Sequence, residues 1–338
     1  MRKLASIQKI KTLEPLENAD AIEKATVLGW QLVVKKGEFK AGDLCVYCEI
    51  DSLMPDRPEF EFLRPRNMRI RTIRLRGQVS QGICFPLSVL PEETEITEDA
   101  DVTGILGITK YEPPVPACLS GIMKGRFPSF IPKTDETRVQ VLQRLLDKYQ
   151  GEKCYVTEKV DGTSVTYFIN NGEYGVCSRN MELLESDENT LWIVGRALDM
   201  ENKLRSLNGN FALQGELIGE NIQSNKLKLK GQTVLFFNIF DINKSEYLPF
   251  ELFIKVTGDL GLKTVPLIET DYILPNSIEE IIKKSVRKSL VVPDVWAEGI
   301  VIRPLREIRD FQLNDEGLVH GRVSFKAVNP EFLIKYSE

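Results

Sequence analysis

Short stretches in which apolar and polar residues alternate make up much of the first hundred or so residues of the chain. Alternation with a period of two predicts β-strands, and the turn signals between the stretches predict tight connections. We expect strands at 30–36, 43–50, 69–77 and 82–87. One short helix is expected near residues 18–24. Several short strands at regular spacing are typical of a small β-barrel or sandwich.

The pattern changes after a Pro-rich segment, residues 111–116, which we interpret as a linker. Thr134 is predicted to cap a helix, with Asp135 and Glu136 at the positive end of its dipole. The apolar stripe of this helix would consist of Val139, Leu142, Leu145 and Leu146. Strands interrupted by further helices follow, which indicates an α+β domain of antiparallel sheets and helices.

Two later helices have clear end signals. One is predicted at 249–260, where Gly261 would end it. Another is predicted to start at Ser277, because Glu280 stands three residues on and completes a capping box.

The composition is that of a globular protein with room for two domains. The chain has 338 residues, of which 42% are hydrophobic and 28% charged. It has no apolar run long enough to span a membrane and no signal-like start. We therefore expect an intracellular, cytoplasmic protein without membrane association, a nuclear location being open if the source is eukaryotic. We take the chain to be a monomer.

Residue counts narrow the chemistry. The only histidine is His320, so a Ser-His-Asp or Cys-His mechanism would depend on that one residue. The net charge is −5, so contact with nucleic acid must come from local basic patches. Cys45 and Cys48 form a lone C-x-x-C without a second pair. We expect buried, reduced thiols rather than a zinc site.

The most informative segment is residues 157–164, Thr-Glu-Lys-Val-Asp-Gly-Thr-Ser. An apolar run leads into Lys159, and Gly162 after Asp161 permits a tight turn. A lysine attacks phosphorus only as the neutral amine, so its pKa must be lowered from about 10.4 by burial or by a nearby cation. A divalent metal held by carboxylates would lower that pKa and neutralise a triphosphate. Alone, the four-residue pattern Lys159–Gly162 also fits a surface β-turn.

Five further segments follow it in order, and each alone could be an ordinary strand or core segment. They are Ser178-Arg179-Asn180, Gln214–Gly219, Phe236–Asp241, Trp296–Arg303 and Val323–Lys326. The ordered set resembles the covalent nucleotidyltransferase superfamily of DNA ligases, RNA ligases and mRNA capping enzymes. In that superfamily the motif lysine forms a phosphoramidate with a nucleoside monophosphate.

The resemblance assigns roles residue by residue. Lys159 matches the nucleophile, Asp161 the acidic residue two positions on, and Arg179 the arginine that holds the ribose and the accepting 5′ end. Glu216 and Glu298 match acids of the third and fourth motifs. Asp161, Glu216 and Glu298 would together hold Mg²⁺ or Mn²⁺, since oxygen ligands accept both.

Further residues are expected to contact the nucleotide. Lys326 matches the lysine on the α-phosphate. Members of the superfamily often carry K-x-K at this point, but here the first place is Ser324. Glu158 and Val160 flank the nucleophile. Phe240 is our first choice for the aromatic that stacks on adenine, with Phe237 in reserve because strand alternation leaves the choice open.

A narrower resemblance comes from the segment Phe127–Arg138 and from the strand-rich N-terminal region. Both are similar to the Deinococcus/Naegleria-type RNA ligases, in which an OB-type barrel precedes the catalytic domain. The resemblance implies an OB-like nucleic-acid-binding domain at 1–112 and a nucleotidyltransferase domain at 118–338. Only twelve residues follow Lys326, so we expect no C-terminal OB domain of the kind found in DNA ligases and capping enzymes.

Arginines are concentrated in the N-terminal region. Six of them lie between residues 64 and 76: Arg64, Arg66, Arg69, Arg71, Arg74 and Arg76. Within the predicted strand, Arg69 and Arg71 would lie on one face and Arg74 and Arg76 on the other. Such a strand suits the phosphate backbone of a nucleic acid, although charge also protects an edge strand from aggregation.

The resemblance implies an ATP-dependent RNA ligase acting through lysyl-AMP and an adenylylated 5′ end. Its partner would be RNA, as a nicked duplex or RNA/DNA hybrid with an RNA 3′-OH strand. Three alternatives stay open: a capping-type guanylyltransferase, a DNA ligase, and a catalytically silent RNA-binding protein.

Overall fold

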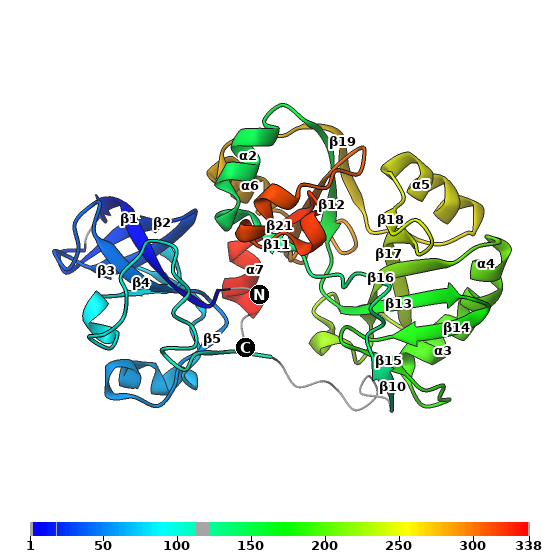
Figure 1. Ribbon diagram of the computed structural model, residues 1–338, viewed down its shortest axis with the longest axis horizontal. Coiled ribbons are helices and arrows are strands. Elements are labelled where there is room, and N and C mark those ends of the chain that lie inside the picture. The colour runs from blue at the N-terminus through cyan, green and yellow to red at the C-terminus, as the bar shows by residue number, and fades with distance from the viewer. Residues whose placement is uncertain (1–2, 18, 113–121, 337–338) are drawn as a thin grey trace. The chain divides into compact units, whose positions relative to one another are not determined.

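The computed structural model describes residues 3–17, 19–112 and 122–336. These residues divide into two compact units. The first reaches residue 113 and also takes in Val139–Gln143 and the C-terminal segment from Pro330. The second holds the remaining residues between 114 and 329. Figure 1 shows the elements of each unit.

The first unit is built on an antiparallel sheet of five strands in the order β3-β2-β1-β4-β8. The strands are β1 (Ala5–Pro15), β2 (Ile22–Val27), β3 (Trp30–Lys35), β4 (Leu44–Cys48) and β8 (Ile83–Phe85). Two small pairs accompany them: β5 (Ser52–Leu53) with β9 (Thr109–Lys110), and β6 (Thr72–Leu75) with β7 (Gln78–Gln81). The short helices of this unit are η1 (Pro58–Arg66), η2 (Leu87–Val89), η3 (Val139–Val141) and α7 (Pro330–Tyr336). The nearly closed sheet is the barrel of an OB fold, as expected.

The core of the first unit holds large side chains, among them Trp30, Tyr47 and Phe60, all fully buried. The helix expected near residues 18–24 is wrong, because residues from Ile22 onward form β2. In β2, every residue is paired with β3, and the strand also pairs with β1. Pairing on both edges supplies hydrogen bonds that one helical turn cannot match. The long strand β1 was not predicted.

The second unit contains two sheets. The seven-stranded sheet has the order β10-β15-β14-β13-β16-β17-β18, and the five-stranded sheet has the order β11-β21-β20-β12-β19. The first sheet comprises β10 (Met123–Arg126), β13 (Thr163–Asn170), β14 (Glu173–Cys177), β15 (Met181–Leu183), β16 (Phe211–Gly219), β17 (Gln232–Asp241) and β18 (Glu246–Tyr247). The second comprises β11 (Thr137–Arg138), β12 (Lys153–Lys159), β19 (Leu267–Ile273), β20 (Gly299–Pro304) and β21 (Phe325–Val328). The helices are α2 (Gln143–Tyr149), α3 (Thr190–Ala197), α4 (Met200–Ser206), η4 (Gln223–Asn225), α5 (Phe250–Asp259), α6 (Ile278–Ser285), η5 (Phe311–Glu316) and η6 (Val319–Gly321).

The two faces of the seven-stranded sheet differ, because helices cover one of them. Val165 and Tyr167 of β13 lie in a core cluster with side chains of α3, α4 and α5, which cover that face. Because side chains alternate along a strand, Ser164 and Thr166 belong to the other face, as do their pairing partners Glu216 and Gln214 of β16. This second face therefore carries polar groups near Glu216 and an apolar cluster around Phe168.

Two of the three helices predicted for the second unit are confirmed. Helix α5 ends before Gly261, which has a φ of +62°, and Ser277 caps α6 by accepting a hydrogen bond from the Glu280 N–H. The helix start at Thr134 is wrong. Residues 137–138 form β11, and the α-helix begins only at Gln143. The expected stripe of Val139, Leu142, Leu145 and Leu146 is nevertheless fully buried.

The remaining predictions concern the cysteines, the linker and membrane association. The five cysteines in the described part of the chain are free and buried, Cys45 and Cys48 among them. Residues 113–116 of the expected linker lie outside the described residues. None of the described helices is long and apolar enough to cross a membrane.

Candidate active site

Lys159 is the last residue of β12. It pairs with Gly299 of β20, so the next residue upstream, Glu298, lies beside it. The Lys159 ammonium donates a hydrogen bond to Glu298 Oε2 at 2.5 Å. Both side chains are largely shielded, with 24% and 18% exposure. Two neighbouring strand ends thus bring a lysine and a carboxylate together from positions 139 residues apart.

The turn after Lys159 packs closely against β16. A Cβ added at Gly162 would come within 2.4 Å of the Leu217 carbonyl oxygen and 2.9 Å of Glu216 Cγ. Only glycine therefore allows the turn to lie this close to Glu216. The same turn carries Asp161, whose carboxylate forms an ion pair with Lys226 at 3.2 Å.

The carboxylates of this site influence one another. Burial and the nearby Glu298 raise the pKa of Asp161 to about 6, although Lys226 and Lys159 oppose the shift. Burial raises the pKa of Glu216 to about 8, against the lowering effect of Lys159 and with the support of Glu298. Burial and a neighbouring carboxylate thus make Asp161 and Glu216 harder to ionise than free carboxyl groups.

Lys159 itself departs from the expectation of a neutral amine. Burial acts to lower its pKa, as predicted, but the carboxylates of Glu298 and Glu216 outweigh burial and raise it. In the protein alone the amine is therefore charged. Its deprotonation requires that another cation engage these carboxylates.

Lys326 of β21 lies near the same group of charges. Its register partner in the parallel pair is Arg138 of β11. Burial, together with the positive charges of Lys159 and Arg138, lowers the pKa of Lys326 to about 7. Lys326 thus lies among other positive charges, an arrangement that an anionic ligand would stabilise.

The carboxylates of this site fit a divalent cation that also has ligands from water or from a substrate. Glu298 raises the pKa of both Asp161 and Glu216, but no three acidic, histidine or cysteine side chains in the described residues lie close enough to hold an ion by themselves. These residues fit an ion that keeps several waters and takes further ligands from a substrate, as Mg²⁺ commonly does.

Three predicted contact residues lie around this cluster in different settings. Arg179 is half exposed and donates to Asp135 at 2.5 Å, and its charge acts to lower the pKa of Glu216. The Glu158 carboxylate is buried and accepts hydrogen bonds from the Ser289 hydroxyl and the Leu290 N–H. Val160 is also buried, with 3% exposure.

The two candidate phenylalanines of β17 differ in exposure. Phe240 is 2% exposed and packs in a cluster with Phe168 and Tyr247. Phe237 is only partly buried, and the Arg303 guanidinium lies 5.9 Å from its ring centre. The ring of Phe240 therefore belongs to the core and that of Phe237 is more accessible, while the residue that stacks on adenine stays a prediction.

An open pocket borders the cluster. Its lining includes Ile218 and Leu235 of the seven-stranded sheet, together with Pro266 and Val291. Leu235 is the pairing partner of Glu216, and the Pro266 carbonyl accepts a hydrogen bond from the Glu158 N–H. The pocket thus adjoins both Glu216 and the nucleophile strand.

Sequence reasoning missed two basic residues of the site. Arg138 ends the segment Phe127–Arg138, but only its pairing with β21 places it beside Lys326. Lys226 belongs to a run of alternating lysines, Lys226, Lys228 and Lys230. That alternation was the one available signal, and it does not reveal the partner Asp161.

The arginines of the first unit are arranged differently from the prediction. Only Arg74 lies within a strand, since β6 covers Thr72–Leu75. Arg76 occupies the turn after it, with a φ of +48°. Arg69 stacks on Tyr111 and pairs with Asp51. The two-faced arrangement expected for a continuous strand is therefore wrong.

An OB-fold barrel together with an α+β unit that gathers a strand-end lysine and carboxylates defines a class, the nucleotidyltransferases with an N-terminal OB domain. A family model described as an OB-fold domain matches residues 4–87, and one described as RNA ligase matches residues 152–328. The chain belongs to the RNA ligase family, and the expected enzyme class is confirmed.

Solved structures agree over the full length. Naegleria gruberi RNA ligase with PPi is 40% identical, with a TM-score of 0.90, and the match covers 100% of this chain and 99% of that one. A lysine-to-alanine variant of the same ligase with ATP and Mn is 39% identical, with a TM-score of 0.90 and 99% of both chains covered. A glutamate-to-alanine variant with ATP and Mn is 39% identical, with a TM-score of 0.89 and 100% coverage of both. No curated protein matches the chain.

Proposed function

We propose that this RNA ligase seals 3′-OH/5′-phosphate ends of RNA with ATP and a divalent metal, and that Lys159 is its nucleophile. The observation that carries the proposal is the contact between the Lys159 ammonium and Glu298, with Glu216 and Asp161 close by. Solved structures of the Naegleria gruberi ligase with ATP and Mn support the choice of nucleotide and metal.

The proposed reaction has three steps, each an in-line displacement at phosphorus. The Lys159 amine attacks the α-phosphorus of ATP, which forms a nitrogen–phosphorus bond and releases pyrophosphate. A 5′-phosphate oxygen of the RNA then attacks the same phosphorus and frees the lysine. Finally the 3′-OH attacks the 5′-phosphate, and AMP leaves.

Each residue has a separate task in this scheme. Asp161, Glu216 and Glu298 would hold the metal, which would supply charge neutralisation and lower the pKa of the Lys159 amine. Lys326 holds the α-phosphate, and Arg138 beside it strengthens the positive field. Arg179 leaves Asp135 to contact the ribose and the accepting 5′ end.

For the base, we propose that Phe237 rather than Phe240 stacks on adenine, with the Glu158 and Val160 main chain at its edge. Phe237→Ala is expected to raise the half-saturating ATP concentration roughly tenfold without loss of stability, since the ring is partly exposed. Phe240→Ala should instead lower the free energy of unfolding by about 3 kcal/mol, because it empties a buried aromatic site. If only Phe240→Ala weakens ATP binding, the assignment to Phe237 is wrong.

The preferred substrate is proposed to be a nick in a duplex whose 3′-OH strand is RNA. The domain at 1–112 is proposed to bind that duplex, and the domain at 118–338 to carry the chemistry. Nicks with either ribose or deoxyribose at the 3′-OH end test this preference. Equal sealing rates would favour a DNA ligase.

The first test of the activity uses α-labelled ATP or GTP with a divalent metal, followed by a denaturing gel. A covalent label from ATP is expected, and Lys159→Ala should abolish it. A label from GTP alone would indicate a guanylyltransferase, and a label that survives Lys159→Ala at full strength would refute the nucleophile. No label from either nucleotide would favour the silent RNA-binding protein.

A further inference from the structure

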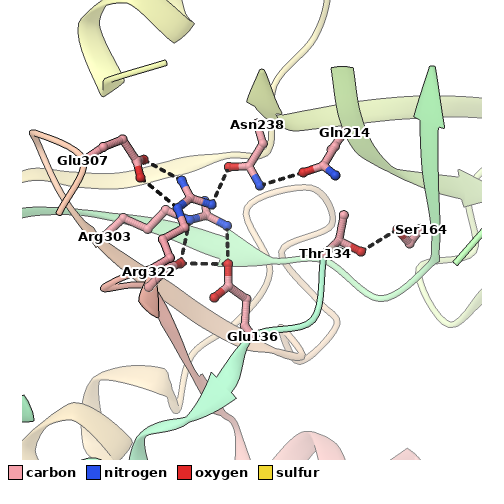
Figure 2. A network of polar contacts seen from close by, with 9 residues as sticks. Thr134, Glu136, Ser164, Gln214, Asn238, Arg303, Glu307 and Arg322 are labelled. Carbon is pink, nitrogen blue, oxygen red and sulfur yellow. Dashed lines mark hydrogen bonds and ion pairs between the residues drawn. The ribbon is translucent and has the colours of Figure 1, made fainter. Parts of the chain in front are cut away.

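Ser324 stands two residues before Lys326 and is buried, with 3% exposure. Its hydroxyl accepts a hydrogen bond from Arg303 Nε at 2.9 Å and donates one to Glu136 Oε1 at 2.7 Å. Arg303 Nη2 also donates to the same Glu136 oxygen, at 2.9 Å. The three side chains form a closed triangle, and Figure 2 labels two of them, Glu136 and Arg303.

The triangle lies at the start of the parallel pair formed by β11 and β21. Glu136 directly precedes β11, and Ser324 directly precedes β21. In this pair Thr137 is the partner of Phe325 and Arg138 the partner of Lys326. A shift of one residue would reverse the faces of β11. The triangle therefore fixes the register that places Arg138 beside Lys326.

A second set of hydrogen bonds runs from Arg322, two residues before Ser324, to the seven-stranded sheet. Arg322 donates two hydrogen bonds to Glu307 and one to Asn238 Oδ1, at 3.1 Å. Asn238 in turn donates to Gln214 Oε1 at 3.2 Å. Gln214 lies on β16 two residues before Glu216, on the same face of the strand. Figure 2 shows this chain of contacts continuing from Arg322.

We propose that Ser324 and Glu136 are positioning residues for Lys326, and that position 324 is part of the scaffold rather than a second phosphate contact. This inference rests on the proposed function, in which Lys326 holds the α-phosphate. The hydroxyl accepts a hydrogen bond from Arg303 and donates one to Glu136, so it bridges the two charged side chains.

A lysine at this position would disturb the balance of charge. Two arginines, Arg303 and Arg322, face two glutamates, Glu136 and Glu307, within the network. An ammonium at 324 would add a buried cation that has no carboxylate of its own, close to the already crowded Lys326. The serine is therefore what this arrangement of arginines and glutamates requires.

The test measures lysyl-AMP formation in single turnover at a series of ATP concentrations. Ser324→Ala is expected to lower the maximum rate about tenfold and to change the half-saturating ATP concentration less than twofold, because Lys326 is misplaced rather than removed. Ser324→Thr keeps the hydroxyl and should recover most of the rate. Ser324→Lys should lose more than Ser324→Ala. A Ser324→Lys rate at or above wild type would show a phosphate subsite and overturn the proposal.

Ser285→Ala is the matched control. Ser285 is fully buried, and its hydroxyl donates to the Ile282 carbonyl within α6. The control loses an equally buried hydroxyl away from β11 and should keep the wild-type rate. An equal loss in Ser285→Ala and Ser324→Ala would mean that general destabilisation explains both, and the proposal would be wrong.

A second measurement does not depend on activity. Hydrogen exchange of the main-chain amides in 136–139 and 325–328 should be faster in Ser324→Ala and in Glu136→Ala than in wild type, because the pairing of β11 with β21 loosens. Unchanged exchange in both variants would refute the positioning role. If the wild-type protein forms no adduct with ATP, the proposed function fails, while the exchange experiment still decides the inference.

Discussion

The second unit contains two buried groups of charged side chains, and they differ in how their charges are satisfied. In the network around Ser324, arginines and glutamates meet through direct hydrogen bonds. In the cluster around Lys159, burial and neighbouring carboxylates raise the pKa of Asp161 to about 6 and that of Glu216 to about 8. The arginines of the network already pair with glutamates, although Arg303 Nη1 is buried without a hydrogen-bond partner, whereas the carboxylates of the cluster are held together against their charges. The contrast separates the scaffold of this fold from its chemistry.

The largest effect is expected from removing a carboxylate of the cluster. Glu298→Ala should lower the rate of lysyl-AMP formation by about a thousandfold or more, about 4 kcal/mol, because the metal loses a ligand and Lys159 loses its partner. A gel assay with α-labelled ATP measures this. Glu279→Ala, an exposed glutamate in the first turn of α6, is the control. Near-normal adduct formation in Glu298→Ala would remove Glu298 from the site.

Breaking the network around Ser324 should mainly lower the stability of the protein. Arg322→Met is expected to lower the free energy of unfolding by about 3 kcal/mol, because it leaves the Glu307 carboxylate without its partner. Chemical denaturation measures the change. The double variant with Glu307→Gln should recover part of the loss. A single variant as stable as wild type would mean that the network does not contribute to the scaffold.

Removing a carboxylate from the cluster around Lys159 should raise the free energy of unfolding instead of lowering it. Glu216→Gln is expected to stabilise the metal-free protein by about 1 kcal/mol while abolishing adduct formation, since it relieves crowding among buried carboxylates. Unfolding in the presence of a chelator measures the change. A destabilised Glu216→Gln protein would show that the cluster is as satisfied as the network.

Exposed charges of the first unit should have the smallest effect. Arg66 and Arg76 are exposed, and replacing either with alanine is expected to weaken RNA binding two- to fivefold, less than about 1 kcal/mol, with a shallower salt dependence. Filter binding at several salt concentrations measures this, and lysyl-AMP formation should not change. Unaltered RNA binding in both variants would place the nucleic-acid surface elsewhere.

Part of the fold and the choice of site residues could be predicted from local sequence patterns. The ends of α5 and α6 were predictable because capping depends on residues within one turn. Lys159, Glu216 and Glu298 lie together in the structure, as the ordered motifs indicated, although their roles stay predictions.

Other features depend on contacts that no local pattern records. The segment from Thr134 was expected to be helical, but Glu136 bonds to Arg303, 167 residues away, and the chain continues into β11. The choice between Phe237 and Phe240 depended on strand alternation, which a bulge in β17 opposite Gln214 and Gly215 interrupts. Residues beyond such an irregularity change faces, and the sequence does not show where it falls.

Gly162 has a consequence for how far the site can vary. The turn that follows the nucleophile rests directly on the main chain of β16, where even one methyl group would overlap the Leu217 carbonyl oxygen. The separation between the attacking amine and the acid at 216 is therefore set by two backbones in contact. Rotation of neighbouring side chains cannot restore that separation once the backbones are forced apart. We therefore expect position 162 to accept no side chain larger than that of glycine.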